Sequence, residues 1–331
     1  MRPMFSHSLA ALALSFACAM PAAADALKVT LLGTGSPLPS PERFSQSTLV
    51  EAGQEKLLFD FGRGAPIRLT QLGVPIGSLT AHFITHFHSD HVGGLPDVWM
   101  TGWIATPFGG RETPMVVYGP EGTEALTGHL TEAFSEDARV READEHLDPA
   151  GIAFDAHDAP PGKVYERNGV TVTAFEVNHG PLIKPAYGYR VDYDGKAVVI
   201  SGDTKKDERI AEAAKGADLL IHEVAYIDHS MMEKFPSYQE ILDHHTRPSE
   251  AGETFAEAEP RLAAFSHIVS RGAPGMTQPE VLDAILAEAH GTWDGPIVMG
   301  ADLMSFTIDG AITVTDPEGE TVLTVPATAA N

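Results

Sequence analysis

The chain has 331 residues, enough for one large domain or two small ones. It carries 22 basic against 46 acidic residues, a formal net charge of −24, and no run of lysine or arginine. Because a surface of this sign repels phosphate backbones, the composition argues against a long nucleic-acid partner.

The N-terminal segment has the pattern of a secretory signal. Arg2 supplies a positive charge, and residues 9–20 are apolar but too few to span a bilayer. Small residues follow, so that cleavage after Ala24 or after Ala26 would release the mature chain. We therefore expect a signal peptide over residues 1–26 and a periplasmic or secreted protein, with an uncleaved anchor as the alternative.

The expected mature domain, residues 27–331, has no second segment able to cross a membrane. Cys18 is the only cysteine of the chain and lies in the part to be removed, so disulfides and thiolate ligands are both excluded. A lipoprotein signal that uses Cys18 is a further alternative, although Ser15-Phe16-Ala17 is a poor lead-in for one.

The first half of the mature chain alternates between strand and helix patterns. Apolar or alternating runs between glycine-rich turns predict strands over residues 27–32, 47–50, 56–61, 81–84 and 115–118. Helices are expected over residues 65–72 and 94–104, and another starts within residues 119–123. Trp99 and Trp103 share a face of the second helix, which favours core packing over a stacking wall beside a site.

The second half continues this alternation after an acidic stretch. Residues 135–161 show no period, so we expect an irregular outer loop or a cover for the site. Asp194-Gly195 is a strong hairpin turn. Strands are predicted over residues 170–177, 187–193, 196–200, 217–221, 261–266 and within 297–325, and helices over residues 205–215, 279–288 and from a Ser249 cap to about Ala258. Because strands and helices alternate throughout, the fold class is α/β.

One stretch, Thr85-His86-Phe87-His88-Ser89-Asp90-His91, holds three imidazoles and a carboxylate within six residues. It follows the strand predicted over residues 81–84, and loops held by a rigid strand commonly carry metal ligands. His86 and His88 could share one ion, whereas Asp90 and His91 could face a second. Imidazole and carboxylate without thiolate suit Zn, Mn or Fe rather than Ca. The alternative is a histidine-rich surface loop.

Similar residues recur beside glycines at the ends of other predicted strands, namely His179, Asp203 and His267. Ordinary histidines would not be expected to fall repeatedly at such positions. The expected ligands are therefore His86, His88, Asp90, His91, His179, Asp203 and His267. Seven ligands are more than one tetrahedral ion uses, so we expect two divalent ions per chain, zinc in the first instance.

The stretch 85–91 resembles the first metal motif of the metallo-β-lactamase-fold hydrolases. The order strand, glycine loop, hairpin, helix, strand and metal loop is similar to the opening of their ribonuclease Z-like and arylsulfatase-like branch. This resemblance covers residues 27 to about 304 and implies a four-layer αββα sandwich of two mixed sheets flanked by helices.

The resemblance also implies how the seven ligands divide. One ion would be held by three imidazoles, those of His86, His88 and His179. The other would be held by one carboxylate and two imidazoles, those of Asp90, His91 and His267. The carboxylate of Asp203 would bridge the two ions. A hydroxide shared by the two ions would be the nucleophile, and Asp90 could also orient it.

Two late motifs of the ribonuclease Z-like branch resemble His222-Glu223-Val224 and His245-Thr246. In that branch a Glu–His pair delivers a proton to the leaving oxygen. The chemistry is sound, because a carboxylate fixes the imidazole and raises its pKa. We therefore expect Glu223 and His245 to be catalytic, with His244 as the alternative acid and His222 an ordinary buried histidine.

Ser270-Arg271 resembles a short motif near the substrate in the same branch. Arg271 could bind an anionic oxygen through two hydrogen bonds, and an ordinary surface arginine is the alternative. His229 is expected to be an ordinary surface histidine.

Three departures then rank the branches of the family. One hairpin fills residues 179–203, which leaves no room for the long basic arm that ribonuclease Z uses for tRNA; the chain is expected to be exported; and its charge is strongly negative. Glyoxalase-like, β-lactamase and sulfur-dioxygenase branches lack the pair Glu223 and His245. Residues 64–69 and 183–189 also resemble the exported arylsulfatase and phosphodiesterase branch.

We therefore expect an exported binuclear hydrolase of small sulfate or phosphate esters. Hydrolysis of a lactone or β-lactam carbonyl is the second expectation, a ribonuclease Z-type endonuclease ranks lower, and a non-enzymatic binding protein ranks last. The expected partner is a small anionic ester rather than a long nucleic acid, and the oligomeric state is left open, with a homodimer as one option.

Overall fold

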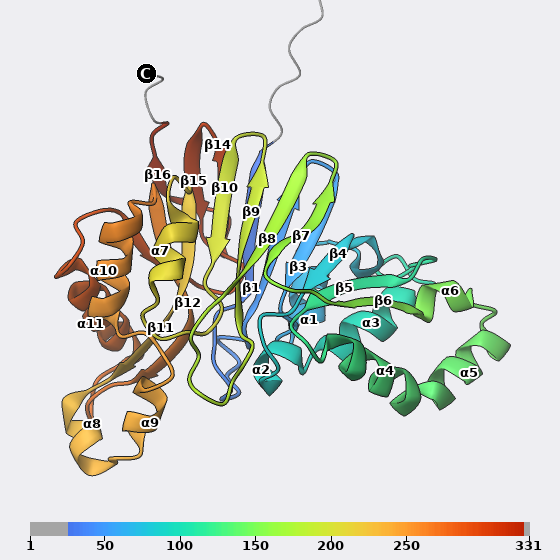
Figure 1. Cartoon of the computed structure of the whole chain (residues 1–331), viewed down its shortest axis with the longest axis horizontal. Coiled ribbons are helices and arrows are strands. Elements are labelled where there is room, and N and C mark those ends of the chain that lie inside the picture. Colours follow the sequence, from blue (N-terminus) through green and yellow to red (C-terminus); the bar gives the residue numbers. More distant parts are fainter. Residues whose placement is uncertain (1–25, 328–331) are drawn as a thin grey trace, which may run out of the picture.

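The computed structural model describes residues 26–327, so the expected signal peptide lies outside the described residues except for Ala26. Across this range the chain folds into two mixed β-sheets that pack face to face, with helices on both outer faces (Figure 1). The expected α/β class and αββα arrangement are confirmed. No helix within residues 26–327 is long and apolar enough to cross a membrane.

The first sheet is built from both ends of the described chain. Its strands are β1 (Leu27–Gly33), β2 (Ser47–Ala52), β3 (Glu55–Phe59), β4 (Ala81–Phe83), β5 (Met115–Gly119), β6 (Phe154–Asp158), β14 (Ser305–Asp309), β15 (Ala311–Thr315) and β16 (Thr321–Val325). Among the described residues their order is β16-β15-β14-β1-β2-β3-β4-β5-β6. Strands β3 to β6 are parallel, so β4 ends at the same edge of the sheet as β3 and β5.

The second sheet comes from the middle of the chain. Its strands are β7 (Gly162–Arg167), β8 (Val170–Glu176), β9 (Tyr187–Tyr193), β10 (Lys196–Ile200), β11 (Leu219–Ile227), β12 (Leu262–Arg271) and β13 (Ile297–Met299). Within residues 26–327 their order is β13-β12-β11-β10-β9-β8-β7, and β10 to β13 are parallel. The carboxyl ends of β10, β11 and β12 therefore meet at one edge.

Helices cover the outer faces of the sandwich. On the side of the first sheet they are α1 (Ala65–Gln71), α2 (Ser89–Val92), α3 (Leu95–Trp103), α4 (Thr123–Ala133), α5 (Ser135–Asp144) and α6 (Pro149–Ile152), with a 3-10 turn η1 (Ile76–Ser78). The helices that connect strands of the second sheet are α7 (Glu208–Ala214), α8 (His229–Lys234), α9 (Tyr238–Leu242), α10 (Pro248–Ala258) and α11 (Gln278–His290). Apolar side chains of α1 and α3 pack on the first sheet, and those of α7, α10 and α11 on the second.

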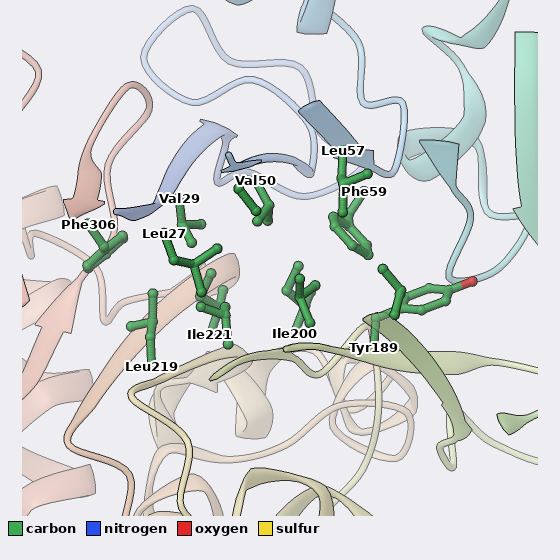
Figure 2. Packing of buried hydrophobic residues seen from close by; sticks show 14 of the residues in the cluster. Leu27, Val29, Val50, Leu57, Phe59, Tyr189, Ile200, Leu219, Ile221 and Phe306 are labelled. Carbon is green, nitrogen blue, oxygen red and sulfur yellow. The ribbon is translucent and has the colours of Figure 1, made fainter. Parts of the chain in front are cut away.

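The main core lies between the two sheets. Side chains of β1, β2 and β3 point toward those of β9, β10 and β11 (Figure 2). Phe59 stacks on Phe83 with ring centroids 4.7 Å apart, and Tyr189 of the opposite sheet lies 5.4 Å from Phe59. Burial of one such side chain contributes roughly 1.5–3 kcal/mol. This interface therefore fixes the two sheets, and the loops at their ends, relative to each other.

Trp99 and Trp103 belong to the core, as expected. Their side chains are 0% and 2% exposed, and each indole N–H donates to a backbone carbonyl oxygen at 2.8 Å, that of Ile152 and that of Asp148 respectively. The two rings fill the space between α3 and α6 and are not a stacking wall beside the site.

The expectation of an irregular segment over residues 135–161 is wrong. The segment contains α5, α6 and β6, and α5 lies away from the sandwich (Figure 1). No residue of α5 is buried, and β6 is an edge strand. Neither element therefore carries the apolar period on which a prediction from sequence depends.

Other boundaries also differ from those predicted. β11 and β12 run past residues 221 and 266 because they continue to pair as far as Ile227 with Arg271. The segment between β11 and Pro248, for which no helix was predicted, contains α8 and α9. Ser249 does not cap α10: the helix begins at Pro248, and the Arg247 N–H donates to the Glu250 carboxylate at 2.9 Å, so Ser249 lies inside the first turn.

Candidate metal centre

The loops at one end of the sandwich bring all seven expected ligands together. The first sheet supplies four of them, from the turn after β4 and from α2, whereas the second sheet supplies the residues that follow β8 and β10 and one within β12. Two clusters result, and each could hold a metal ion: His86, His88, His179 and Asp203, and then Asp90, His91 and His267. A third group, which overlaps both, consists of Asp203, His245 and His267.

In the first cluster the ring nitrogens converge on one point. His88 Nδ1 lies 2.9 Å from His86 Nε2 and 3.3 Å from His179 Nε2. Each ligand atom of this cluster is within 4.8 Å of every other. His88 is exposed, so the cluster opens to solvent at this residue.

The second cluster contains one carboxylate and two imidazoles. Asp90 Oδ2 lies 3.1 Å from His267 Nε2 and 3.6 Å from His91 Nε2. All three side chains are buried. If Asp203 is left aside, the Asp90 carboxylate makes the second cluster more negative than the first, which then contains imidazoles alone.

Asp203 lies between the clusters. Its Oδ2 is 3.2 Å from His267 Nε2 and 3.3 Å from His91 Nε2 in one cluster. The same oxygen is 3.7 Å from His179 Nε2 and 3.8 Å from His86 Nε2 in the other. A single oxygen that faces nitrogens of both clusters is placed as a bridge between two ions would be.

Unpaired buried atoms show that the clusters fit metal ions. Asp90 Oδ1 and His91 Nε2, both in the second cluster, are buried without a hydrogen-bond partner. Buried polar groups are normally paired, so two unpaired ligand atoms in one cluster fit a bound ion. Imidazole and carboxylate are ligands that divalent zinc, manganese and iron accept.

The protonation states of His86, His179 and Asp203 agree with this role. Burial lowers the pKa of His86 well below its usual value and that of His179 to about 4, so both rings are neutral, as ligands must be. Burial works to raise the pKa of Asp203, but the charges of His267 and His91 outweigh it and hold that pKa well below its usual range. The bridging position therefore carries a full negative charge. Burial works to lower the pKa of His91, but the Asp203 and Asp60 carboxylates raise it well above its usual value, so a metal ion bound there would displace a proton from this ring.

Asp60 and Thr85 orient two ligands, and the sequence did not reveal them. Asp60 Oδ2 lies 2.7 Å from His91 Nδ1, and because a carboxylate only accepts, that nitrogen carries the proton and Nε2 is free for a metal. The Thr85 hydroxyl donates to the same carboxylate at 2.9 Å and lies 3.0 Å from His86 Nδ1. One buried carboxylate thus sets the tautomer of a ligand in each cluster.

A β-bulge aims His267 at the centre. In the pairing of β11 with β12, Glu223 faces Ser266 and Val224 faces Ile268, so His267 has no partner on β11. Its φ is 43°, a conformation that costs a non-glycine residue about 1–3 kcal/mol. Bulges of this kind turn a side chain out of the strand alternation. Here the bulge places the imidazole in the second cluster.

Glu223 and His245 lie against both clusters. His245 Nδ1 is 3.2 Å from Glu223 Oε2, and the ring stacks on His267 with centroids 5.5 Å apart. Burial works to lower the pKa of His245, but the Glu223 carboxylate raises it to about 9. The other Glu223 oxygen accepts from the Thr246 N–H at 2.8 Å, which fixes the carboxylate.

His244 has a different task. Its carbonyl oxygen lies 2.9 Å from His179 Nδ1 and accepts a hydrogen bond from that N–H, and its ring covers Gly180. It therefore orients a candidate ligand through its backbone, and its ring is outside the three groups of residues able to hold a metal within 26–327. This geometry favours His245 over His244 as the acid.

The remaining expected residues lie outside the clusters. His222 is fully buried against Phe255, and His229 is exposed on α8. Arg271 pairs with Ile227 at the far end of β12 and borders a groove of about 580 Å³ between that strand and the loop after β1. The structure thus places Arg271 outside both clusters, on this groove.

Comparison with known proteins identifies the family. A family model described as Anti-Pycsar protein Apyc1 matches residues 27–252. Ribonuclease Z from Mycobacterium marinum is 36% identical over 280 residues, which are 84% of this chain and 97% of that protein. Among solved structures, the metallo-β-lactamase fold protein YhfI from Bacillus subtilis has a TM-score of 0.65 at 18% identity, over 86% of this chain and 100% of that one. Human tRNase Z, short form, has a TM-score of 0.61 at 23% identity, over 84% and 98% of the two chains.

These relatives reverse one ranking drawn from the sequence. The sequence favours the arylsulfatase-like branch over ribonuclease Z, yet the chain matches ribonuclease Z along 97% of the length of that protein. The two solved structures, at their lower identities, show the fold. The extent of the family match and of the ribonuclease Z match shows that this chain belongs to the family of Apyc1 and ribonuclease Z, within the metal-dependent hydrolases of the metallo-β-lactamase fold.

Proposed function

We propose that this protein hydrolyses phosphodiester bonds and that His245 donates a proton to the leaving oxygen. The observation that carries this proposal is the position of His245, whose ring borders His267 at 5.5 Å and His179 at 5.1 Å. It is therefore next to both clusters, while Glu223 holds its Nδ1. The ribonuclease Z relatives, which are nucleases by name, support the choice of a phosphodiester.

The seven candidate ligands would hold the ions that bind a phosphate group. Divalent ions held there would supply a nucleophile derived from water and would neutralise charge on the phosphate oxygens. Asp60 and Thr85 keep His91 and His86 in the tautomers that leave Nε2 toward the clusters. The buried side chains of the second cluster exclude bulk water from that side of the reacting group.

His245 performs the proton transfer. With Nδ1 bound to Glu223, Nε2 is the atom that carries the transferable proton. A pKa of about 9 keeps the ring protonated at neutral pH, and cations held nearby would lower this pKa toward the working pH. Loss of that proton leaves a neutral imidazole, which Glu223 keeps in place for the next turnover.

A small or single-stranded diester suits this chain best. The hairpin of β9 and β10 occupies most of the interval between His179 and Asp203, and the net charge is −24. Both features weaken binding of a long, structured polyanion. Arg271, beside the groove of about 580 Å³, is the side chain proposed to bind a further anionic oxygen of the substrate.

Cleavage of a precursor tRNA is the second candidate function. The observation that favours it is the match to ribonuclease Z over 97% of that protein's length. The same metal centre would serve both substrates, so the difference lies in how the rest of the substrate binds.

A substrate panel tests the proposal. Metal-loaded protein would be given bis-p-nitrophenyl phosphate, p-nitrophenyl phosphate, p-nitrophenyl sulfate, a lactone, a short single-stranded RNA and a precursor tRNA. We expect the phosphate diester and the short RNA to be hydrolysed fastest. Faster turnover of the sulfate would restore the ranking drawn from the sequence, and efficient cleavage restricted to the precursor tRNA would establish the second candidate. Hydrolysis of the lactone alone would overturn the phosphodiester proposal.

A further inference from the structure

A small closed chamber lies behind the candidate metal centre. It has a volume of about 10 Å³ and is lined mainly by polar side chains, among them those of Gln46, Ser201, Asp203, Glu223 and Ser266. A cavity needs on the order of 10–15 Å³ to hold one water, together with two to four polar partners. The chamber therefore has the size and the chemistry of a site for a single water.

The two oxygens of Asp203 have different surroundings. Oδ2 faces the ring nitrogens of both clusters at 3.2–3.8 Å. Oδ1 is buried and has no hydrogen-bond partner among the described residues. Because Asp203 also lines the chamber, Oδ1 is the acceptor that a water in the chamber would satisfy. A buried carboxylate oxygen left without a partner is destabilising, because it loses its hydration and gains no hydrogen bond in return.

Gln46 supplies the matching donor. It lies just before β2, is 5% exposed, and its Oε1 accepts a hydrogen bond from Ser266 Oγ at 2.8 Å. With the carbonyl oxygen engaged, the amide nitrogen is the group that remains to donate. Ser266 precedes His267, so the same strand that delivers a ligand also fixes the Gln46 amide.

We propose that one ordered water occupies this chamber, accepts a hydrogen bond from Gln46 Nε2 and donates one to Asp203 Oδ1. Gln46 and Ser266 are then positioning residues for the bridging carboxylate. This hydrogen bond would keep Oδ1 turned toward the chamber, so that Oδ2 remains the oxygen that faces the ring nitrogens of both clusters. This inference rests on the proposed function, because it needs Asp203 to bridge two ions.

The size of the effect follows from what such partners do elsewhere. Removal of a group that hydrogen-bonds a metal ligand on the side away from the metal typically lowers metal affinity or activity about 10–100-fold. Replacement of Gln46 by leucine removes both the donor and the acceptor at nearly the same side-chain size. Replacement of Ser266 by alanine removes only the hydroxyl that orients the amide, so its effect should be the smaller.

Metal affinity of the protein is the direct test. Zn²⁺ binding to wild type, Gln46→Leu, Ser266→Ala and the double variant would be measured by competition with a chromophoric chelator. We expect Gln46→Leu to weaken binding about 10–100-fold and Ser266→Ala to weaken it less. The double variant should be no weaker than Gln46→Leu, because both act through one hydrogen-bonded chain. Gln54→Leu, at an exposed position in the turn between β2 and β3, is the matched control and should bind as wild type does.

A crystal structure of the zinc-loaded protein provides the second measurement. We expect density for one water about 3 Å from both Asp203 Oδ1 and Gln46 Nε2. An empty chamber, a direct bond between the two side chains, or Oδ1 bound to an ion would overturn the proposal, as would affinities of both single variants within twofold of wild type. If wild type binds two ions and hydrolyses the diester, such a result removes the water and leaves the proposed function intact. If wild type binds no ion, both fail.

Discussion

At the scale of single residues, the proposed function assigns metal binding to seven side chains and proton transfer to the pair His245 and Glu223. His245 is close enough to Asp203 and His267 to hold an ion with them, but its Nδ1 faces the Glu223 carboxylate 3.2 Å away. An imidazole that is hydrogen-bonded to a carboxylate other than the metal ligands can gain and lose a proton without changing the charge of those ligands. This division leads to a prediction about leaving groups.

His245→Ala is expected to retain both metals and to lose rate in proportion to the basicity of the leaving group. An alkoxide needs a proton to depart, so its ester should lose about 10²–10⁴-fold, whereas p-nitrophenoxide departs unaided and its ester should lose little. Glu223→Gln should show the same trend more weakly, because the imidazole remains. The measurement is kcat for a series of diesters alongside metal content. An equal loss for every leaving group, or loss of metal, would assign His245 a structural or ligand role.

The sequence predicted the residues that carry the chemistry better than those that orient them. The ligands were recognisable because imidazoles and carboxylates recur where predicted strands end, although the structure places His267 inside β12. Asp60 escaped notice because it is 31 residues from His91, and nothing local marks it except a position between β3 and a glycine-rich turn. Gln46 escaped for the same reason, since its partner Ser266 is 220 residues away. Contacts of this kind exist only once the two sheets have packed.

At the scale of elements, strands with one buried face were predictable and edge elements were not. β9 and β10 have the predicted bounds, because apolar runs flank an Asp-Gly turn. β6 and β7 are edge strands with mostly exposed or half-buried residues, so no alternation marks them. The extension of β11 and β12 past the centre comes from their mutual pairing, and the bulge at His267 follows from that register. Neither can be read from one strand alone.

The apolar interface between the sheets should dominate stability without governing chemistry. Leu219 begins β11 and is fully buried between the sheets (Figure 2). Leu219→Ala is expected to lower the free energy of unfolding by about 2–5 kcal/mol, because a cavity remains where the side chain was. Chemical denaturation measures this change, and kcat of the folded fraction should stay near that of wild type. Leu182→Ala is the matched control: Leu182 is 93% exposed, and its loss should change stability by less than about 0.5 kcal/mol. Equal effects for both leucines would contradict the assigned core.

At the scale of the whole molecule, the charge and the N-terminal segment concern where the protein works. A net charge of −24 favours small substrates over long polyanions, and this preference stays a proposal. Export also stays a prediction, because residues 9–20 lie outside the described part of the chain. The centre also joins the two sheets, since each cluster takes ligands from both of them. Metal should therefore stabilise the fold as a unit.

Removal of metal is expected to lower the melting temperature of the whole domain. Asp90 and Asp203 are buried carboxylates with unpaired oxygens, and ions that bind only the folded chain stabilise it by mass action. Free metal at 100 times its Kd contributes about 2.7 kcal/mol per site, which corresponds to roughly 5–10 °C in a domain of this size. Differential scanning fluorimetry with and without a chelator measures the shift, and metal analysis should give two ions per chain. Asp203→Ala should abolish both the shift and the binding of the two ions, whereas Asp309→Ala, at an exposed position on β14, should preserve them. A melting temperature that is the same with and without the chelator would contradict stabilisation by metal. An Asp203→Ala variant that keeps both ions would show that Asp203 does not bridge a metal pair.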